Sequence, residues 1–333
     1  NIRLSPHLVP ALEQSLPMYI KAVKAWKQLA LQLDSNIELT IEGGLMVAED
    51  TEQLEFLKKK CAREQFLGLN VEMLDRVQIE RIAPYLGKSV IGAEFCADEG
   101  KVNPLLANSA IERLAITSGV HFFRRLRIDR LEISGNAIHA HTTIGIIRAS
   151  RIVIAAGSGS GHLAEQLDIH IPTLAEPLHM NVTEPTAPMI PHLIQHAERS
   201  ITMKQLPAGN IVIGGGWPAD IFGPKEHPTV RMDSLINNLI LAKNIVPAIN
   251  SLHLIRTWAG INSITDGRSV LGQEKDQEQV YFALPGDAGY TLGPLCARLI
   301  VDLMQGRVPE IPIEQYSPMR FSGGYERMHK EIV

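Results

Sequence analysis

Apolar side chains recur every three or four residues along several stretches of this sequence, which is the spacing of one face of an α-helix. The longest stretch runs from about Pro10 to Leu33. Capping residues support two others, since Asp50 precedes one and Asn103-Pro104 opens another. Helices are therefore predicted over residues 10–33, 51–65, 78–82, 103–118, 162–167, 230–245 and 289–305.

Between the helices the pattern changes to short runs that are typical of strands. A turn at Ser134-Gly135-Asn136 indicates an antiparallel hairpin, and the apolar run from Arg151 to Ala156 is typical of a buried parallel strand. The mixture predicts an α/β (α+β mixed) fold whose proline-rich tail, after Gln305, leaves the core. Strands are predicted over residues 37–41, 45–48, 121–123, 128–133, 137–143, 146–149, 151–156, 178–182, 201–203, 211–214, 252–260 and 280–283.

Composition limits the classes of function. A net charge of −4 gives no electrostatic footprint for nucleic acid, and no run approaches the roughly 18 apolar residues of a membrane span. The three cysteines, Cys61, Cys96 and Cys296, are far apart, so neither a disulfide framework, a metal site nor an iron–sulfur cluster is expected. A location in a reducing cytoplasm is predicted.

One candidate motif is a strand that runs into Gly157-Ser158-Gly159-Ser160-Gly161. A strand followed by glycines and a helix start can place backbone N–H groups against a diphosphate. The complete dinucleotide pattern Gly-x-Gly-x-x-Gly would need a glycine where His162 stands. An ordinary strand-to-helix turn explains this motif equally well, and NAD binding has little support.

Two later motifs have the same ambiguity. In the segment from Gly286 to Pro294, Gly289 and the helix start would let a planar ligand approach the backbone, where positive charge would stabilise a reduced flavin. A glycine turn capping a helix is the simpler alternative. Farther upstream, a strand predicted to end at Ala259-Gly260 precedes a tight Asp266-Gly267 turn, which an ordinary hairpin would also explain.

Taken in order, and with the segments 43–47 (GGLMV) and 99–104 (EGKVNP), these motifs resemble the D-amino-acid oxidase superfamily of flavoproteins over about residues 33–312. Within this superfamily, the sequence resembles most the flavin subunit of opine and hydroxyproline dehydrogenases. The resemblance implies an FAD-binding Rossmann-like domain interleaved with an antiparallel-sheet substrate domain. It also implies that the first domain is N-terminally incomplete, with the βαβ unit carrying Gly-x-Gly-x-x-Gly upstream of Asn1. The implied ranges are 1–33, 98–170 and 265–333 for the FAD domain, and 34–97 and 171–264 for the substrate domain.

The resemblance also implies roles for individual residues. Ile128 matches an adenine contact, and Ala155, Ala156 and Gly157 match the turn near the ribityl and diphosphate groups. The shell around the isoalloxazine is matched by Gly260, Asp287, Ala288, Gly289, Tyr290 and Thr291.

The sequence differs from the family pattern at the positions that bind the substrate. The arginines that bind a substrate carboxylate in glycine oxidase-like members are absent, with Asn262 where one would fall and Asp287 near the other. Tyr290, Asn262 and Asp287 are therefore the candidate substrate contacts, and Lys204 and His179 are weaker ones. Two of these have plainer alternatives: Asp287 would cap the following helix, and His179 would be a sheet residue with a hydrogen-bonded ring.

The implied function is FAD-dependent oxidation of an amine or amino acid of the D-amino acid, opine or hydroxyproline type. Hydride would pass from the C–N carbon to flavin N5, giving an imine, and the electrons would go on to partner subunits. Two alternatives are an amine oxidase that uses oxygen and a non-catalytic scaffold subunit with a flavin fold. NAD-dependent dehydrogenation ranks last.

Overall fold

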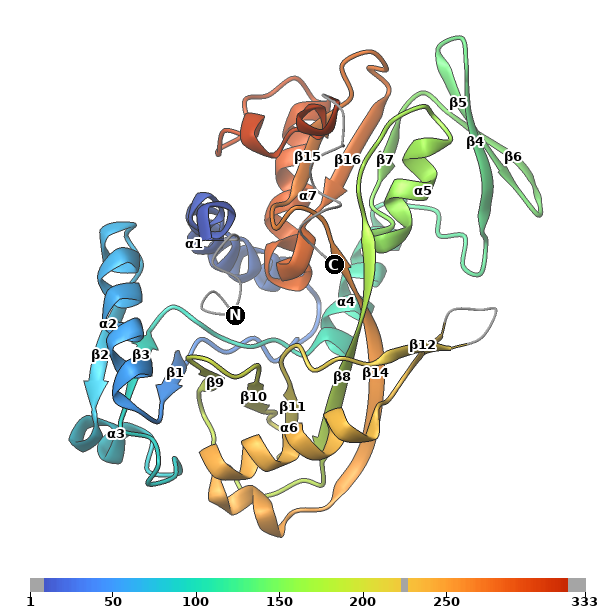
Figure 1. Cartoon of the computed structure of the whole chain (residues 1–333). Helices are drawn as coiled ribbons and strands as arrows, with labels where there is room; N and C mark the ends of the chain where they lie inside the picture. The colour runs from blue at the N-terminus through green and yellow to red at the C-terminus, as the bar shows by residue number, and fades with distance from the viewer. Residues whose placement is uncertain (1–8, 223–226, 323–333) are drawn as a thin grey trace. The chain divides into compact units, whose positions relative to one another are not determined.

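The chain alternates between two units in the computed structural model, which describes residues 9–222 and 227–322 (Figure 1). The large-sheet unit is formed mainly by residues 30–114 and 176–261, and the parallel-pair unit by residues 10–29, 115–175 and those from 262 onward. Each unit is therefore assembled from segments far apart in sequence. None of the described helices is long and apolar enough to cross a lipid bilayer.

An eight-stranded mixed sheet with the order β14-β8-β11-β10-β9-β1-β3-β2 is the centre of the large-sheet unit. Apolar side chains from alternate strand positions pack with Leu241 and Ile245 of the helix α6 in one buried cluster. The strands of this sheet are β1 (Gly44–Ala48), β2 (Val71–Asp75), β3 (Gly92–Cys96), β8 (Leu174–Thr183), β9 (Leu193–His196), β10 (Thr202–Gln205), β11 (Ile211–Gly214) and β14 (Leu254–Ile264). A separate pair of strands, β12 (Asp220–Phe222) and β13 (His227–Thr229), and four helices complete the unit: α2 (Thr51–Phe66), α3 (Arg76–Ile82), most of α4 (Pro104–Thr117) and α6 (Met232–Ile245).

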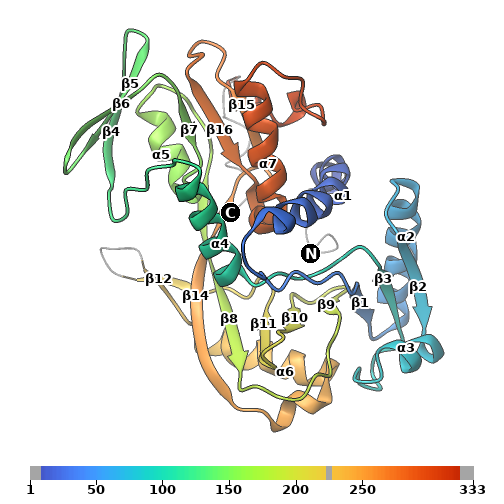
Figure 2. The same ribbon diagram turned by 180° about the vertical axis from the view of Figure 1, so that it is seen from behind.

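The parallel-pair unit contains two small sheets. In the sheet β15-β16-β7, strand β7 runs parallel to β16, whereas β15 is antiparallel to it. The helix α7 packs on β15 and β16, and α1 lies beside α7 (Figure 2). The elements of this unit are α1 (Val9–Gln32), β4 (Ile128–Ser134), β5 (Ala137–Thr142), β6 (Gly145–Ala149), β7 (Ile152–Ile154), α5 (Ser160–Glu165), β15 (Val270–Gln273), β16 (Val280–Leu284) and α7 (Gly289–Met304).

The predicted helices are confirmed, and local chemistry explains them. Asp50 is the N-cap of α2, where its carboxylate accepts a hydrogen bond from the Gln53 backbone N–H at 2.8 Å. The predicted hairpin is the β4–β5 pair, with Gly135 at φ +58° in its turn. These elements form as predicted because their signals lie within a few residues.

Several strand predictions are wrong. Residues 121–123 form no strand, because they have no ladder partner among the described residues, and Phe122 and Phe123 are exposed. Residues 37–41 make only an isolated bridge, between Thr40 and Lys101. Strands β2 and β3 were not predicted, since their short runs lack a clear alternation.

Three further expectations also need correction. Strand β7 is parallel as predicted, but Val153 is 38% exposed, so the strand is not buried on both sides. Strand β14 does not end at Gly260 but continues to Ile264. The tail after α7 does not leave the core, because apolar side chains such as Ile311 and Tyr316 are buried against α1 and α7.

Candidate functional site

The parallel strands β7 and β16 end side by side. Val280 pairs with Ile152, and the register continues in the same direction along both strands. The 3₁₀ turn η2 (Gly157–Gly159) and then α5 follow β7, while η4 (Gly286–Ala288) and then α7 follow β16. Two strand-to-helix turns therefore lie at one sheet edge, the kind of place where parallel α/β sheets bind ligands.

Glycines leave the backbone of both turns open. Gly157 has φ +57° and Gly286 has φ +76°, in the left-handed region that favours glycine. A Cβ added at Gly157 would meet one atom within 4 Å, the Cβ of Ser263 at 3.9 Å, and at Gly289 it would meet none. Ala155, Ala156 and Gly157 are exposed. A ligand could therefore approach the main chain closely at either turn.

Side chains close in sequence hold the turn after β7. The Ser160 hydroxyl accepts a hydrogen bond from the Ala156 backbone N–H at 3.0 Å. The Thr173 hydroxyl accepts one from the Gly161 N–H at 3.1 Å and donates one to the Ser158 carbonyl at 2.8 Å. These bonds restrain the glycine-rich turn without covering its exposed side.

One side chain close in sequence and one distant side chain hold the turn after β16. The Ser269 hydroxyl donates to the Pro285 carbonyl at 2.9 Å. The Trp26 indole N–H donates to the carbonyls of Tyr290 and Thr291, each at 3.1 Å. The start of α7 is thus attached to β15 and to α1.

An unpaired hydroxyl lies beside the first turn. Ser263, near the end of β14, has a buried Oγ without a hydrogen-bond partner in the described part of the chain. A buried polar atom of this kind costs free energy unless something pairs with it, so it points to a ligand or water at this place. The sequence indicates the neighbouring Asn262 and not Ser263, because a serine within a strand has no distinctive signal.

The candidate substrate contacts are partly accessible. Tyr290 is 39% exposed, its ring stacks on Trp26 with centroids 5.2 Å apart, and partial burial raises the pKa of its hydroxyl. Asp287 is exposed. The pKa of Tyr19 is raised to about 12, first by burial of the tyrosine and second by the Asp287 carboxylate. The N-cap of α7 is Ala288 and not Asp287, and among the described residues no side-chain hydrogen bond caps this helix.

The other predicted residues lie on three elements. Ala288, Gly289 and Thr291 lie at the start of α7, and Ile128 begins β4, where it packs on the apolar cluster that contains Ile154. Gly260 lies on β14 in the large-sheet unit and is half-buried. The structure therefore brings the residues of both turns to one edge of the parallel-pair unit.

Two weaker candidates lie on strands of the large-sheet unit. His179 is fully buried on β8, which confirms it as a sheet residue, and burial lowers its pKa. Its ring nitrogens make no hydrogen bond of regular geometry among the residues described, although the Asn181 side chain opposes the effect of burial on the pKa. Lys204 lies on β10, where burial and then Lys101 lower its pKa.

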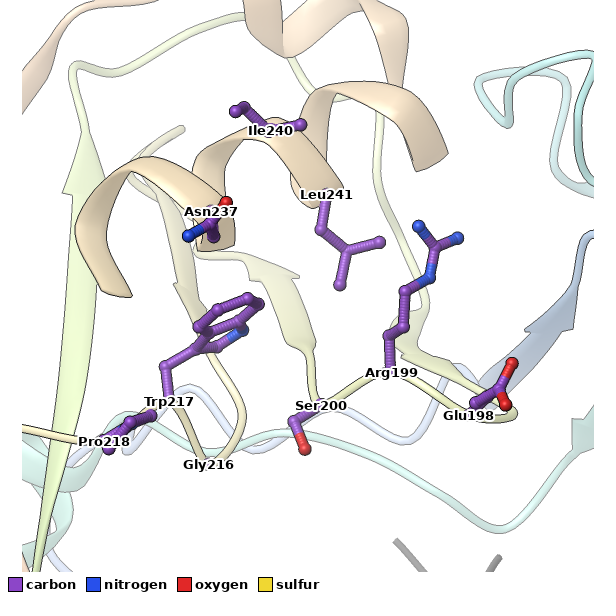
Figure 3. Close-up of a pocket in the computed structure, with 9 residues that line it drawn as sticks. All are labelled: Glu198, Arg199, Ser200, Gly216, Trp217, Pro218, Asn237, Ile240 and Leu241. Atoms are coloured by element: carbon purple, nitrogen blue, oxygen red, sulfur yellow. The ribbon is translucent and has the colours of Figure 1, made fainter. Parts of the chain in front are cut away.

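A groove of about 540 Å³ lies under α6 in the large-sheet unit (Figure 3). Trp217, Arg199 and Leu241 line it, and none of the predicted cofactor or substrate residues does. Arg199 pairs with Glu49 and is not available as an isolated cation. The groove thus shares no lining residue with the glycine turns, and we assign it no function.

The glycine turns fit a dinucleotide cofactor such as FAD. Such a molecule needs backbone donors for its diphosphate and a close approach of the main chain to its ring. The open glycines, the unpaired Ser263 hydroxyl and the start of the sixteen-residue helix α7 offer both. Among the residues that the structure describes, no three or more His, Cys, Asp or Glu side chains are grouped to hold a metal ion.

Comparison with known sequences gives one family and several relatives. The family model described as "FAD dependent oxidoreductase" (DAO) matches residues 3–303. Sarcosine oxidase subunit beta of Arthrobacter sp is 23% identical over 261 residues, which are 76% of this chain and 64% of that protein. Glycine oxidase of Bacillus licheniformis is 25% identical over 298 residues, 85% of this chain and 75% of that protein. The chain thus spans less than two thirds of the sarcosine oxidase subunit.

The fold is also found in solved structures. The crystal structure of L-proline dehydrogenase from P. horikoshii matches with a TM-score of 0.82 and 22% identity, over 92% of this chain and 82% of that chain. This likeness confirms the mixed α/β fold that the sequence predicts.

Proposed function

Because the chain belongs to the DAO family of FAD-dependent oxidoreductases, which confirms the resemblance drawn from the sequence, we propose that the whole protein oxidises an amine or amino acid. The observation that carries the proposal is the pair of open glycine turns at the carboxyl ends of β7 and β16. The parallel-pair unit would then hold most of the FAD contacts.

The cofactor contacts follow from the two turns. Ala155, Ala156 and Gly157 would meet the diphosphate and ribityl groups, and the backbone from Gly289 to Thr291 would face the isoalloxazine. Ile128 would contact the adenine, and Gly260 would belong to the isoalloxazine shell. Bound FAD supplies a hydride acceptor at flavin N5.

The substrate would be an amine or amino acid of the D-amino acid, opine or hydroxyproline type. The exposed carboxylate of Asp287 would attract an ammonium group, and Asn262 and Tyr290 would orient the substrate. Because hydride leaves from the neutral amine, the ammonium would first release a proton to solvent. Loss of hydride from the C–N carbon would then give a protonated imine, which releases a proton to become the imine. The names of the relatives, glycine oxidase and sarcosine oxidase subunit beta, support the broader class of amine or amino-acid substrates.

The electrons would pass to partner subunits. The sarcosine oxidase relative is named as a subunit, which supports a multi-subunit dehydrogenase. The glycine oxidase relative favours a second candidate, direct reoxidation by oxygen. Turnover of the full-length protein with an artificial dye, compared with hydrogen peroxide release, separates the two; fast peroxide release would contradict the dehydrogenase.

The cofactor site can be tested with a matched pair of glycine variants in the full-length protein. Gly157→Ala and Gly135→Ala replace glycines at φ +57° and +58° in the same unit, so both strain the backbone alike. We expect only Gly157→Ala to weaken FAD binding. A loss of about 1.4 kcal/mol in binding free energy, or more, would raise the Kd for FAD by about tenfold or more. Equal FAD affinity in the two variants, or no flavin spectrum in the wild-type protein after FAD is added, would reject the proposal.

A further inference from the structure

The first turns of α7 lack one of their own hydrogen bonds. Pro294 is the sixth residue of this helix and has no backbone N–H. In a regular helix, that N–H would donate to the carbonyl four residues earlier, which is Tyr290. The proline ring also crowds this carbonyl and turns it away from the helix axis. The Tyr290 carbonyl therefore lacks its regular helical donor, and a donor from outside α7 can take that place.

Trp26 of α1 supplies that donor. Its indole N–H lies 3.1 Å from the Tyr290 carbonyl oxygen and 3.1 Å from that of Thr291. The indole is only 6% exposed, and its ring stacks on the Tyr290 ring with an interplanar angle of 19°. Since Trp26 and α7 belong to the same unit, the contact is internal to it.

We propose that Trp26 is a positioning residue that replaces the N–H missing at Pro294 and so holds the first turn of α7 in place. On the proposed function, this turn carries the backbone that faces the isoalloxazine, from Gly289 to Thr291. Trp26 would touch neither FAD nor substrate. It would set the geometry of Tyr290, whose main chain and ring it binds at once.

A double-mutant cycle in the full-length protein tests the proposal. Trp26→Phe keeps an aromatic ring on Tyr290 and removes the donor, while Pro294→Ala restores a backbone N–H to the helix. We expect Trp26→Phe to speed amide hydrogen exchange at Gly293 and Leu295, and to weaken FAD binding, each by about tenfold. In the Pro294→Ala background the same change should alter both by less than about twofold, because the carbonyl then has its helical donor.

Trp217→Phe is the matched control. The Trp217 indole N–H has no hydrogen-bond partner in the described part of the chain, so its loss should leave exchange in α7 unchanged. Equal effects of Trp26→Phe in both Pro294 backgrounds would overturn the proposal and leave Trp26 as packing alone.

The two proposals fail in different ways. An unchanged FAD affinity in Trp26→Phe, with Gly157→Ala still weakened, would overturn the positioning role and leave the cofactor site intact. A wild-type protein that binds no FAD would reject the proposed function, while the exchange cycle would still decide whether Trp26 replaces the missing N–H.

Discussion

The two strand-to-helix turns that follow the parallel strands β7 and β16 have the same order of elements but are stabilised by different contacts. Each leaves a parallel strand, passes a glycine with positive φ and enters a helix. The turn after β7 is held by Ser160 and Thr173, which lie no more than 15 residues from their partners. The turn after β16 is held by Ser269, which lies 16 residues from its partner, and by Trp26, whose two partners are 264 and 265 residues away.

This difference separates local from tertiary control of the site. The first turn depends on its own sequence, so it should keep its shape when distant contacts change. The second depends on how α1, β15 and the tail pack around α7, so damage to that packing should reach the site through it. The predictions below test this division.

The largest effect is expected at Arg320. Its guanidinium binds the Asp266 carboxylate at 2.8 and 2.9 Å, with 13% and 8% of the two side chains exposed, and so attaches the tail to the segment before β15. Arg320→Leu would leave a buried carboxylate short of a partner, at a cost of about 3 kcal/mol in the free energy of unfolding. Denaturant unfolding measures this loss, and hydrogen exchange should rise more in α7 than in α5.

Arg307→Leu is the matched control for Arg320→Leu. Arg307 pairs with Asp302, but 56% of its side chain is exposed, so its loss should cost at most about 1 kcal/mol. Similar losses in the two variants, or exchange that rises equally in α5 and α7, would break the comparison between the turns.

Asp266 also predicts a pH dependence. Burial alone would raise its pKa, but the Arg320 and Arg268 guanidiniums outweigh burial and hold the pKa below its usual value. A lowered folded-state pKa means that the pair stabilises the fold above the unfolded pKa of about 3.9, and that this stability is lost as pH falls below it. Unfolding measured between about pH 5 and pH 2.5 should therefore show a shallower acid loss in Asp266→Asn than in the wild type; equal slopes would contradict this.

The sequence predicts both glycine turns, but not the distant contact that holds the second one, for the same physical reason. Glycines and a following helix are visible in a window of ten residues, and so is the Asp50 cap of α2. The part played by Trp26 is not visible, because an apolar residue at helical spacing predicts burial but not which carbonyl its N–H will meet. The tail was misjudged likewise: its prolines suggest departure from the core, but the Tyr316 hydroxyl donates to the Gln14 carbonyl, 302 residues away.

A smaller effect is expected from Thr173. Thr173→Val keeps the side-chain shape but removes the bonds to Gly161 and Ser158, at a cost of about 1–2 kcal/mol in the free energy of unfolding. Exchange should rise in α5 and not in α7. Thr142→Val, which removes the bonds to the Gly145 carbonyl and the Ile144 N–H in an exposed turn, is the control and should cost less. A rise in α7 exchange as large as in α5 would show that the two turns are coupled.

The smallest single effect belongs to Ser269, where Ser269→Ala loses one hydrogen bond to Pro285 and about 1 kcal/mol. This variant is most informative in a double mutant. Free-energy changes at independent sites add, whereas those at residues that support one structural element do not. Ser269→Ala with Trp26→Phe should therefore depart from the sum of the single effects on unfolding, since both hold the turn after β16. Thr173→Val with Trp26→Phe should add within about 0.5 kcal/mol, since the two side chains hold different turns. Additive effects of Ser269→Ala and Trp26→Phe, together with non-additive effects of Thr173→Val and Trp26→Phe, would contradict the separate support of the two turns.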